Sequence, residues 1–226
     1  MERYKRNIKA LSLEENIILN NSKVCVAGCG GLGGYIIEML GRLGAGTITA
    51  IDGDVFEESN LNRQLLMDEA SIGKSKALAA KERMSRINSK IKVIAVKEFI
   101  TQANAEQLLD GHNVVVDALD SISSRFILQN ACENRGIPLV HGAIAGWYGQ
   151  VSTIYPGERT LSKIYADSKT QGLEKELGVP SFMPALISSI EVSETVKILL
   201  GKENLLRNKL LFIDLLNNDY DIIELG

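Results

Sequence analysis

Short apolar runs alternate along the first 140 residues with longer segments in which apolar side chains recur every three or four positions. The short runs favour buried strands, whereas the longer spacing favours helices with one buried face. We therefore expect strands over residues 22–27, 47–51, 91–96, 114–116 and 138–140, and helices over 32–43, 73–87, 101–109 and 121–135. Thr101 is the expected N-cap of the third helix.

Beyond residue 141 this regular alternation ends. Strands are expected over 149–155, 209–214 and 220–224, and one helix over 184–200. The polar segment 159–178 fits either a lid or a solvated connection. Because parallel strands need crossover connections, the predicted fold class is α/β: a doubly wound, mostly parallel Rossmann-like sheet with helices on both faces and a C-terminal antiparallel extension.

Composition narrows the class of protein. The chain has 226 residues, 45% of them hydrophobic, and a formal net charge of −3, which gives no general nucleic-acid-binding surface. No apolar run approaches the roughly 20 residues that cross a bilayer, and the charged residues 1–11 do not form a signal peptide. Cys25, Cys29 and Cys132 form no CxxC pair. We expect a cytoplasmic protein with reduced thiols and no zinc.

A glycine-rich turn follows the first predicted strand. Gly28, Gly30 and Gly33 form a GxGxxG sequence, and Asp52 ends the second strand. Such a turn lets the backbone approach a phosphate at a helix N-terminus, while the acidic residue accepts hydrogen bonds from ribose hydroxyls. The pattern predicts a nucleotide site. It does not distinguish ATP from NAD, and the glycines could also serve only to pack the helix on the sheet.

Charged residues farther along favour ATP. Asp54, Asn60, Arg63 and Lys76 follow the second strand. Attack by a carboxylate on a triphosphate brings two anions together, so cations must screen the repulsion and stabilise the pyrophosphate. Arg63 and Lys76 are candidates for this role, and Asn60 can bridge phosphate oxygens; the alternative for each is a solvated surface residue.

Two aspartates end the fourth predicted strand. Asp117 and Asp120 lie where the carboxyl ends of parallel strands form a crevice. Since Mg²⁺ prefers carboxylate, phosphate and water oxygens, Asp120 is the candidate magnesium ligand, with Asp117 behind it. Asp120 can instead, or in addition, cap the helix that follows.

These residues together resemble the ThiF/MoeB/HesA family, relatives of the ubiquitin-activating enzymes. The segments that carry the resemblance are Arg3–Arg6, Gly28–Gly33, Asp52–Asp54, Ser59–Gln64, Gly73 with Lys76, and Asp117–Asp120. The resemblance implies that Gly31 contacts the nucleotide, Asp52 the ribose, Asn60, Arg63 and Lys76 the phosphates, and Asp120 the Mg²⁺. It also implies a homodimer in which Arg6 reaches the triphosphate of the other subunit.

The implied reaction is attack by the C-terminal glycine carboxylate of a small ubiquitin-like or sulfur-carrier protein on ATP, giving an acyl-adenylate and pyrophosphate. Residues 1–226 would then form one domain, with the nucleotide bound by about 20–145 and the carrier by about 146–226. The pathway could be thiamine or molybdopterin biosynthesis. Alternatives are the same chemistry on a peptide or tRNA-bound carboxylate, an NAD-dependent dehydrogenase, and an inactive partner subunit.

The sequence departs from many relatives at three places. It lacks the two zinc-binding CxxC pairs, and no cysteine lies between Gln150 and Gly226. Activation is therefore expected to stop at the adenylate, with a separate sulfur donor. Ser121 stands where many relatives have Asn beside the metal-binding Asp, so the cofactor contact near Asp120 can differ.

Overall fold

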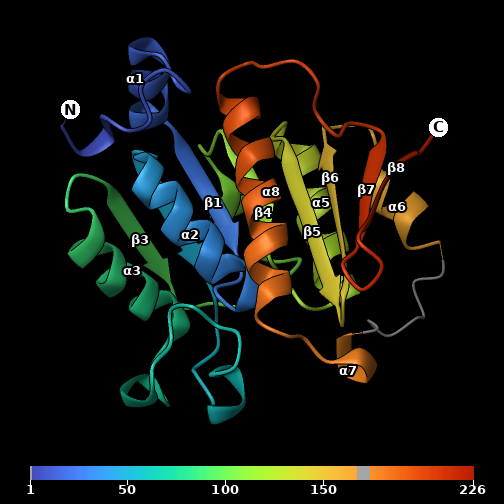
Figure 1. Cartoon of the computed structure of the whole chain (residues 1–226), viewed down its shortest axis with the longest axis horizontal. Coiled ribbons are helices and arrows are strands. Elements are labelled where there is room, and N and C mark those ends of the chain that lie inside the picture. The colour runs from blue at the N-terminus through green and yellow to red at the C-terminus, as the bar shows by residue number, and fades with distance from the viewer. Residues whose placement is uncertain (1, 167–173) are drawn as a thin grey trace.

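One sheet of eight strands forms the centre of the computed structural model, which describes residues 2–166 and 174–226 (Figure 1). Its strand order is β3-β2-β1-β4-β5-β6-β7-β8. The bounds are β1 (Lys23–Ala27), β2 (Thr47–Ile51), β3 (Lys92–Val96), β4 (Val114–Asp117), β5 (Leu139–Ala145), β6 (Tyr148–Ile154), β7 (Lys209–Asp214) and β8 (Asp219–Glu224). The first five strands are parallel and the last three pair antiparallel, which confirms the predicted fold class.

Helices cover both faces of this sheet (Figure 1). Those within the described ranges are α1 (Leu13–Asn21), α2 (Gly31–Leu43), α3 (Lys76–Ile87), α4 (Ala105–Leu109), α5 (Ile122–Arg135), α6 (Thr160–Ile164), α7 (Glu174–Leu177) and α8 (Phe182–Leu199). Short 3-10 turns span Glu2–Tyr4, Glu58–Asn60 and Glu69–Ser71. Side chains of α2, α3 and α8 pack on one face of the sheet and those of α4, α5 and α6 on the other. None of the described helices combines the length and apolar character needed to cross a membrane.

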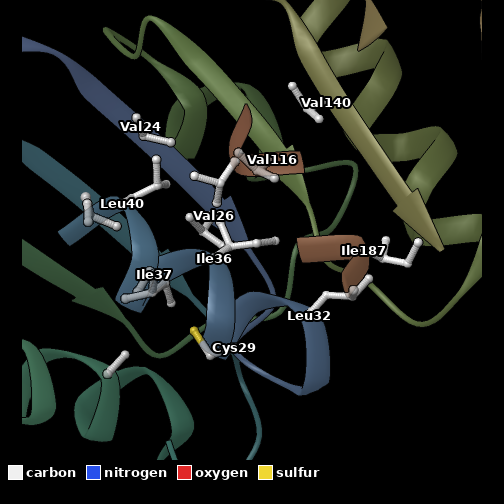
Figure 2. Close-up of a cluster of buried hydrophobic side chains, with 14 of the residues drawn as sticks. Val24, Val26, Cys29, Leu32, Ile36, Ile37, Leu40, Val116, Val140 and Ile187 are labelled. Carbon is white, nitrogen blue, oxygen red and sulfur yellow. The ribbon is translucent and has the colours of Figure 1, made fainter. Parts of the chain in front are cut away.

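Successive side chains of the central strand β1 point alternately into two hydrophobic cores, one on each face of the sheet. In β1, Val24 and Val26 point toward α2, whereas Cys25 and Ala27 point toward α5. Figure 2 shows the first core, where side chains of α2 meet Val116 of β4 and Ile187 of α8. Because β1 is buried on both faces, it is apolar throughout its length after Lys23, as expected of a central parallel strand.

Three local predictions need correction. The helix expected over 73–87 is α3, and it begins at Lys76, because Gly73 has a left-handed φ of 80° that no helix accommodates. Thr101 is not an N-cap: its backbone N–H and its hydroxyl both donate to Asn104 Oδ1 in a turn, so α4 starts only at Ala105. The fifth strand extends to Ala145 because it pairs along its whole length with β6.

The polar segment 159–178 contains α6 and α7. Residues 167–173, on which the lid-or-connection alternative depends, lie outside the described residues. The alternative therefore stays open.

The strand order indicates at which edge of the sheet a ligand is expected to bind. From β1 the chain moves outward to β2 and β3, and then returns to β4 on the other side of β1. Ligands of such sheets bind at this reversal, outside the carboxyl ends of the strands. The turns after β1, β2 and β4 therefore meet at a single edge.

We predict that Leu40→Ala lowers the free energy of unfolding by about 2–5 kcal/mol, because it leaves a cavity where α2 packs on the sheet. Leu40 is fully buried, whereas Leu78 of α3 is 47% exposed. The matched control Leu78→Ala should change stability by no more than about 0.5 kcal/mol. Urea unfolding measures both values, and equal losses would contradict the assigned core.

Candidate nucleotide-binding site

A polar cleft of about 230 Å³ opens at the carboxyl edge of the sheet. The turns after β1, β2, β3 and β4 contribute to its walls, together with residues from the 3-10 turn region and the start of α3. Its lining includes eight of the residues predicted from the sequence: Gly28, Gly30, Gly31, Asp52, Asp54, Arg63, Lys76 and Asp120. These eight residues, up to 92 positions apart in the chain, are thus brought to one place.

Close backbone packing forms the glycine turn. Gly28 has a φ of 98°, and a β-carbon on it would lie 2.5 Å from the carbonyl oxygen of Ala118. A β-carbon on Gly33 would lie 1.9 Å from the carbonyl oxygen of Gly28. Gly33 therefore does not line the cleft but lets α2 approach the turn. At the N-cap, Gly30 offers no side-chain cap, which leaves the first N–H groups of α2 available to an anion.

Asp52 ties this turn to β2. One carboxylate oxygen accepts the Cys29 N–H at 2.7 Å and the other accepts the Asp54 N–H at 2.8 Å. Burial raises the pKa of Asp52, while these two hydrogen bonds and Lys76 act in the opposite direction. The carboxylate thus holds two turns together at the position expected to face a ribose.

Two cationic side chains border the cleft. Lys76, at the start of α3, is only 8% exposed, and its Nζ lies 3.3 Å from Asp54 Oδ2. Arg63 is half-buried, and its Nη1 donates to the Ser59 carbonyl and to Asn62 Oδ1. Both charges therefore lie on the same cleft as the α2 N-terminus, as an anionic ligand requires.

Asp120 is exposed and lines the cleft from the loop after β4. It does not cap α5. The neighbouring Ser121 does so, because its hydroxyl accepts the Ser124 N–H at 3.1 Å. Ser121 is therefore engaged by the helix and is absent from the cleft lining, while the Asp120 carboxylate remains open to the cleft.

Two other predicted residues lie outside the lining. Asn60 is buried, and its Oδ1 accepts the Glu57 N–H, so this side chain stabilises its own turn. Arg6 belongs to the N-terminal segment, which is anchored at the far end of α2: the ring of Tyr4 packs against Gly44, and Arg3 bonds to Asn88. Neither residue contacts the cleft within its own chain.

The sequence assigned no role to several residues that line the cleft, and three of these are Gln64, Phe99 and Arg125. Gln64 is buried, and its Oε1 has no hydrogen-bond partner among the described residues, as expected of a group that awaits a ligand. Phe99 is 62% exposed, and its ring lies against Gly53, where it offers an apolar face to a base. Arg125 of α5 also lines the cleft. Only Phe99 carried a local signal, as an aromatic residue just after a strand.

The cysteines do not supply a nucleophile. Cys29 lies within the glycine turn but is fully buried, and burial raises its pKa well above the ordinary value. Burial likewise raises the pKa of Cys25 to about 12 and that of Cys132 further still. Their thiols therefore stay protonated and uncharged near neutral pH.

Comparison with known proteins agrees with this geometry. A SAMP-activating enzyme E1 from Haloferax volcanii is 32% identical over 99% of this chain and 84% of its own length. A sulfur carrier protein adenylyltransferase from Thermus thermophilus is 32% identical over 89% of the chain and 78% of its own length. The chain spans about half, 48%, of the adenylyltransferase and sulfurtransferase MOCS3 from Danio rerio, with 32% identity.

A solved structure has a similar fold. The tRNA N6-threonylcarbamoyladenosine dehydratase TcdA from E. coli is 27% identical, with a TM-score of 0.75 over 88% of this chain and 95% of its own. The model of the ThiF family matches residues 4–226, which is nearly the whole chain. This protein belongs to the ThiF family.

Proposed function

We propose that this protein adenylylates the C-terminal glycine carboxylate of a small ubiquitin-like sulfur-carrier protein at the expense of ATP. Its relatives in the ThiF family include adenylyltransferases, and this activity explains the cleft better than hydride transfer does. The observation that carries the proposal is the gathering of the open α2 N-terminus, Lys76, Arg63 and Asp120 on one cleft.

Two anions must meet in this reaction. A carboxylate oxygen of the carrier forms a bond to the α-phosphorus of ATP, and the bond from that phosphorus to the bridging oxygen breaks, releasing pyrophosphate. Negative charge grows on the leaving group, so nearby cations lower the barrier. Lys76 and Arg63 would hold the phosphate oxygens, while the α2 N–H groups would bind a phosphate at the glycine turn.

The nucleoside would lie toward β2 and β3. Asp52 faces the cleft there and would accept hydrogen bonds from the ribose hydroxyls. The exposed ring of Phe99 would pack against the base, and the unpartnered oxygen of Gln64 would find a donor.

Asp120 would hold Mg²⁺. The residues fit this ion, because an exposed carboxylate on the same cleft as the phosphate-binding cations can complete a coordination sphere of phosphate and water oxygens. When bound, the ion would neutralise the triphosphate and the departing pyrophosphate. Ser121, already bonded to the Ser124 N–H, would act by capping α5 and thereby fixing the residue next to Asp120.

Arg6 would act in a second subunit of a homodimer. The 13 residues of α2 span about 20 Å, and the N-terminal segment is anchored beyond its C-terminal end. Arg6 lies two residues after Tyr4, and two residues extend at most about 7 Å. Within one chain Arg6 therefore falls short of the phosphates, whereas across a symmetric interface it can approach them.

A second candidate substrate is a tRNA-bound carboxylate, favoured by the likeness to TcdA. The net charge of −3 offers no general attraction to RNA, so the protein carrier is preferred. ATP–pyrophosphate exchange measured with purified carriers ending in Gly-Gly, and separately with tRNA, decides between them. Exchange that depends only on tRNA would overturn the carrier proposal.

We predict that Asp120→Ala abolishes carrier-dependent ATP–pyrophosphate exchange, because the metal loses its protein ligand. Asp110 precedes β4 at the other edge of the sheet, where it pairs with Arg135. The control Asp110→Ala should therefore retain exchange. Circular dichroism checks that both variants fold, and full exchange by folded Asp120→Ala would remove the metal assignment.

Lys76→Ala should reduce the exchange rate by about 10²–10³-fold, the usual cost of losing one electrostatic contact to a transition state. Lys81 lies on the same helix but is exposed, so Lys81→Ala should keep the wild-type rate. Steady-state exchange assays compare the two variants. Equal rates for both would place Lys76 outside the phosphate site.

A further inference from the structure

A buried polar network lies directly behind the cleft. It joins four side chains from four elements: Asp117 at the end of β4, Arg125 of α5, His141 of β5 and Tyr165 just after α6. Asp117 and His141 are completely buried, and Arg125 is 6% exposed. Nothing in the reaction proposed above uses His141 or Tyr165. Their role must be sought in what they hold in place.

The donors and acceptors of this network form one consistent chain. Leu119 N–H donates to Asp117 Oδ1 at 3.0 Å, and His141 Nδ1–H donates to Asp117 Oδ2 at 2.8 Å. His141 Nε2 must then accept, which it does from the Tyr165 hydroxyl at 3.2 Å. The Tyr165 oxygen in turn accepts from Arg125 Nη1 at 2.5 Å and from Gln150 at 3.0 Å.

This chain requires a neutral imidazole with its proton on Nδ1. Burial lowers the pKa of His141, outweighing the opposite effect of its hydrogen bond with Asp117. The uncharged ring keeps Nε2 free to accept the tyrosine proton, so the direction of every hydrogen bond is fixed.

The two ends of the network act on the two peptide groups that flank Leu119, the residue before Asp120. Arg125 donates to the Leu119 carbonyl oxygen twice, from Nε at 3.1 Å and from Nη2 at 2.8 Å. This carbonyl belongs to the planar peptide unit that leads into Asp120. Since Asp117 also holds the Leu119 N–H, the backbone on both sides of Leu119 is fixed, and with it the direction in which Asp120 leaves the loop.

We infer that Asp117, His141, Tyr165 and Arg125 are positioning residues that aim the Asp120 carboxylate into the cleft. The inference rests on the proposed role of Asp120 as metal ligand. Tyr165 is the critical member, because its hydroxyl accepts from Arg125 and donates to His141. Without it, the guanidinium and the imidazole each lose a partner, and the hold of Arg125 on the peptide group before Asp120 weakens.

The test is Tyr165→Phe, with Tyr155→Phe as the matched control, since the Tyr155 ring lies under Arg207 outside the network. Mn²⁺ replaces Mg²⁺ and is titrated into protein saturated with a non-hydrolysable ATP analogue, and free Mn²⁺ is counted by electron paramagnetic resonance. Groups that orient a metal ligand typically contribute about 10–100-fold to affinity. We expect a loss of that size for Tyr165→Phe and none for Tyr155→Phe.

Arg125→Lys provides a second arm, because it keeps the charge but lacks the planar fork that donates twice to Leu119 and once to Tyr165. It should also weaken Mn²⁺ binding.

A purely structural role would lower the urea midpoint yet leave the Mn²⁺ affinity of the folded protein unchanged, and that result overturns the inference. If Asp120→Ala abolishes exchange while Tyr165→Phe binds Mn²⁺ like wild type, only the positioning role fails. If Asp120→Ala itself leaves exchange and Mn²⁺ affinity intact, the proposed function fails first.

Discussion

The lack of space for β-carbons in the turn after β1 is the constraint on which the rest of this molecule depends. The backbone of Gly28 packs against Ala118, and Gly33 packs against Gly28. These contacts hold the end of β1, the start of α2 and the loop after β4 as one unit. The uncapped N–H groups of α2 and the loop that carries Asp120 therefore lie at a fixed separation before any ligand arrives, and electrostatic catalysis requires preorganisation of this kind.

Charge within the cleft is arranged around this unit. Lys76 lies beside Asp54, and the Asp52 carboxylate is occupied by two backbone N–H groups. Asp52 thus fixes two turns of the cleft, and Asp54 fixes the position of Lys76. The positive groups are therefore in place before a ligand binds. Next to Asp120, Asp117 and Arg125 hold the loop after β4 through hydrogen bonds to the backbone of Leu119.

The sequence predicted most of the fold correctly, and its errors have local causes. Two expected strands, 47–51 and 209–214, match β2 and β7 in both bounds. The predicted starts of two helices were less accurate. Gly73 adopts a left-handed conformation, and the Thr101 N–H donates to Asn104 Oδ1 in a turn before α4. The end of β5 was missed, since pairing with β6 rather than local apolar periodicity extends that strand.

What the sequence by itself determined is local: the alternation of strands and helices, the glycine turn, and the polar residues that follow each strand. Periodicity and turn chemistry act over a few residues, so a single sequence reveals them. Only the tertiary structure decided that Gln64, Phe99 and Arg125 share one cleft, and that His141 and Tyr165 lie behind Asp120. Such contacts join residues far apart in the chain. They depend on the order of strands in the sheet and on the packing of helices against it, and neither of these produces a periodic pattern in the sequence.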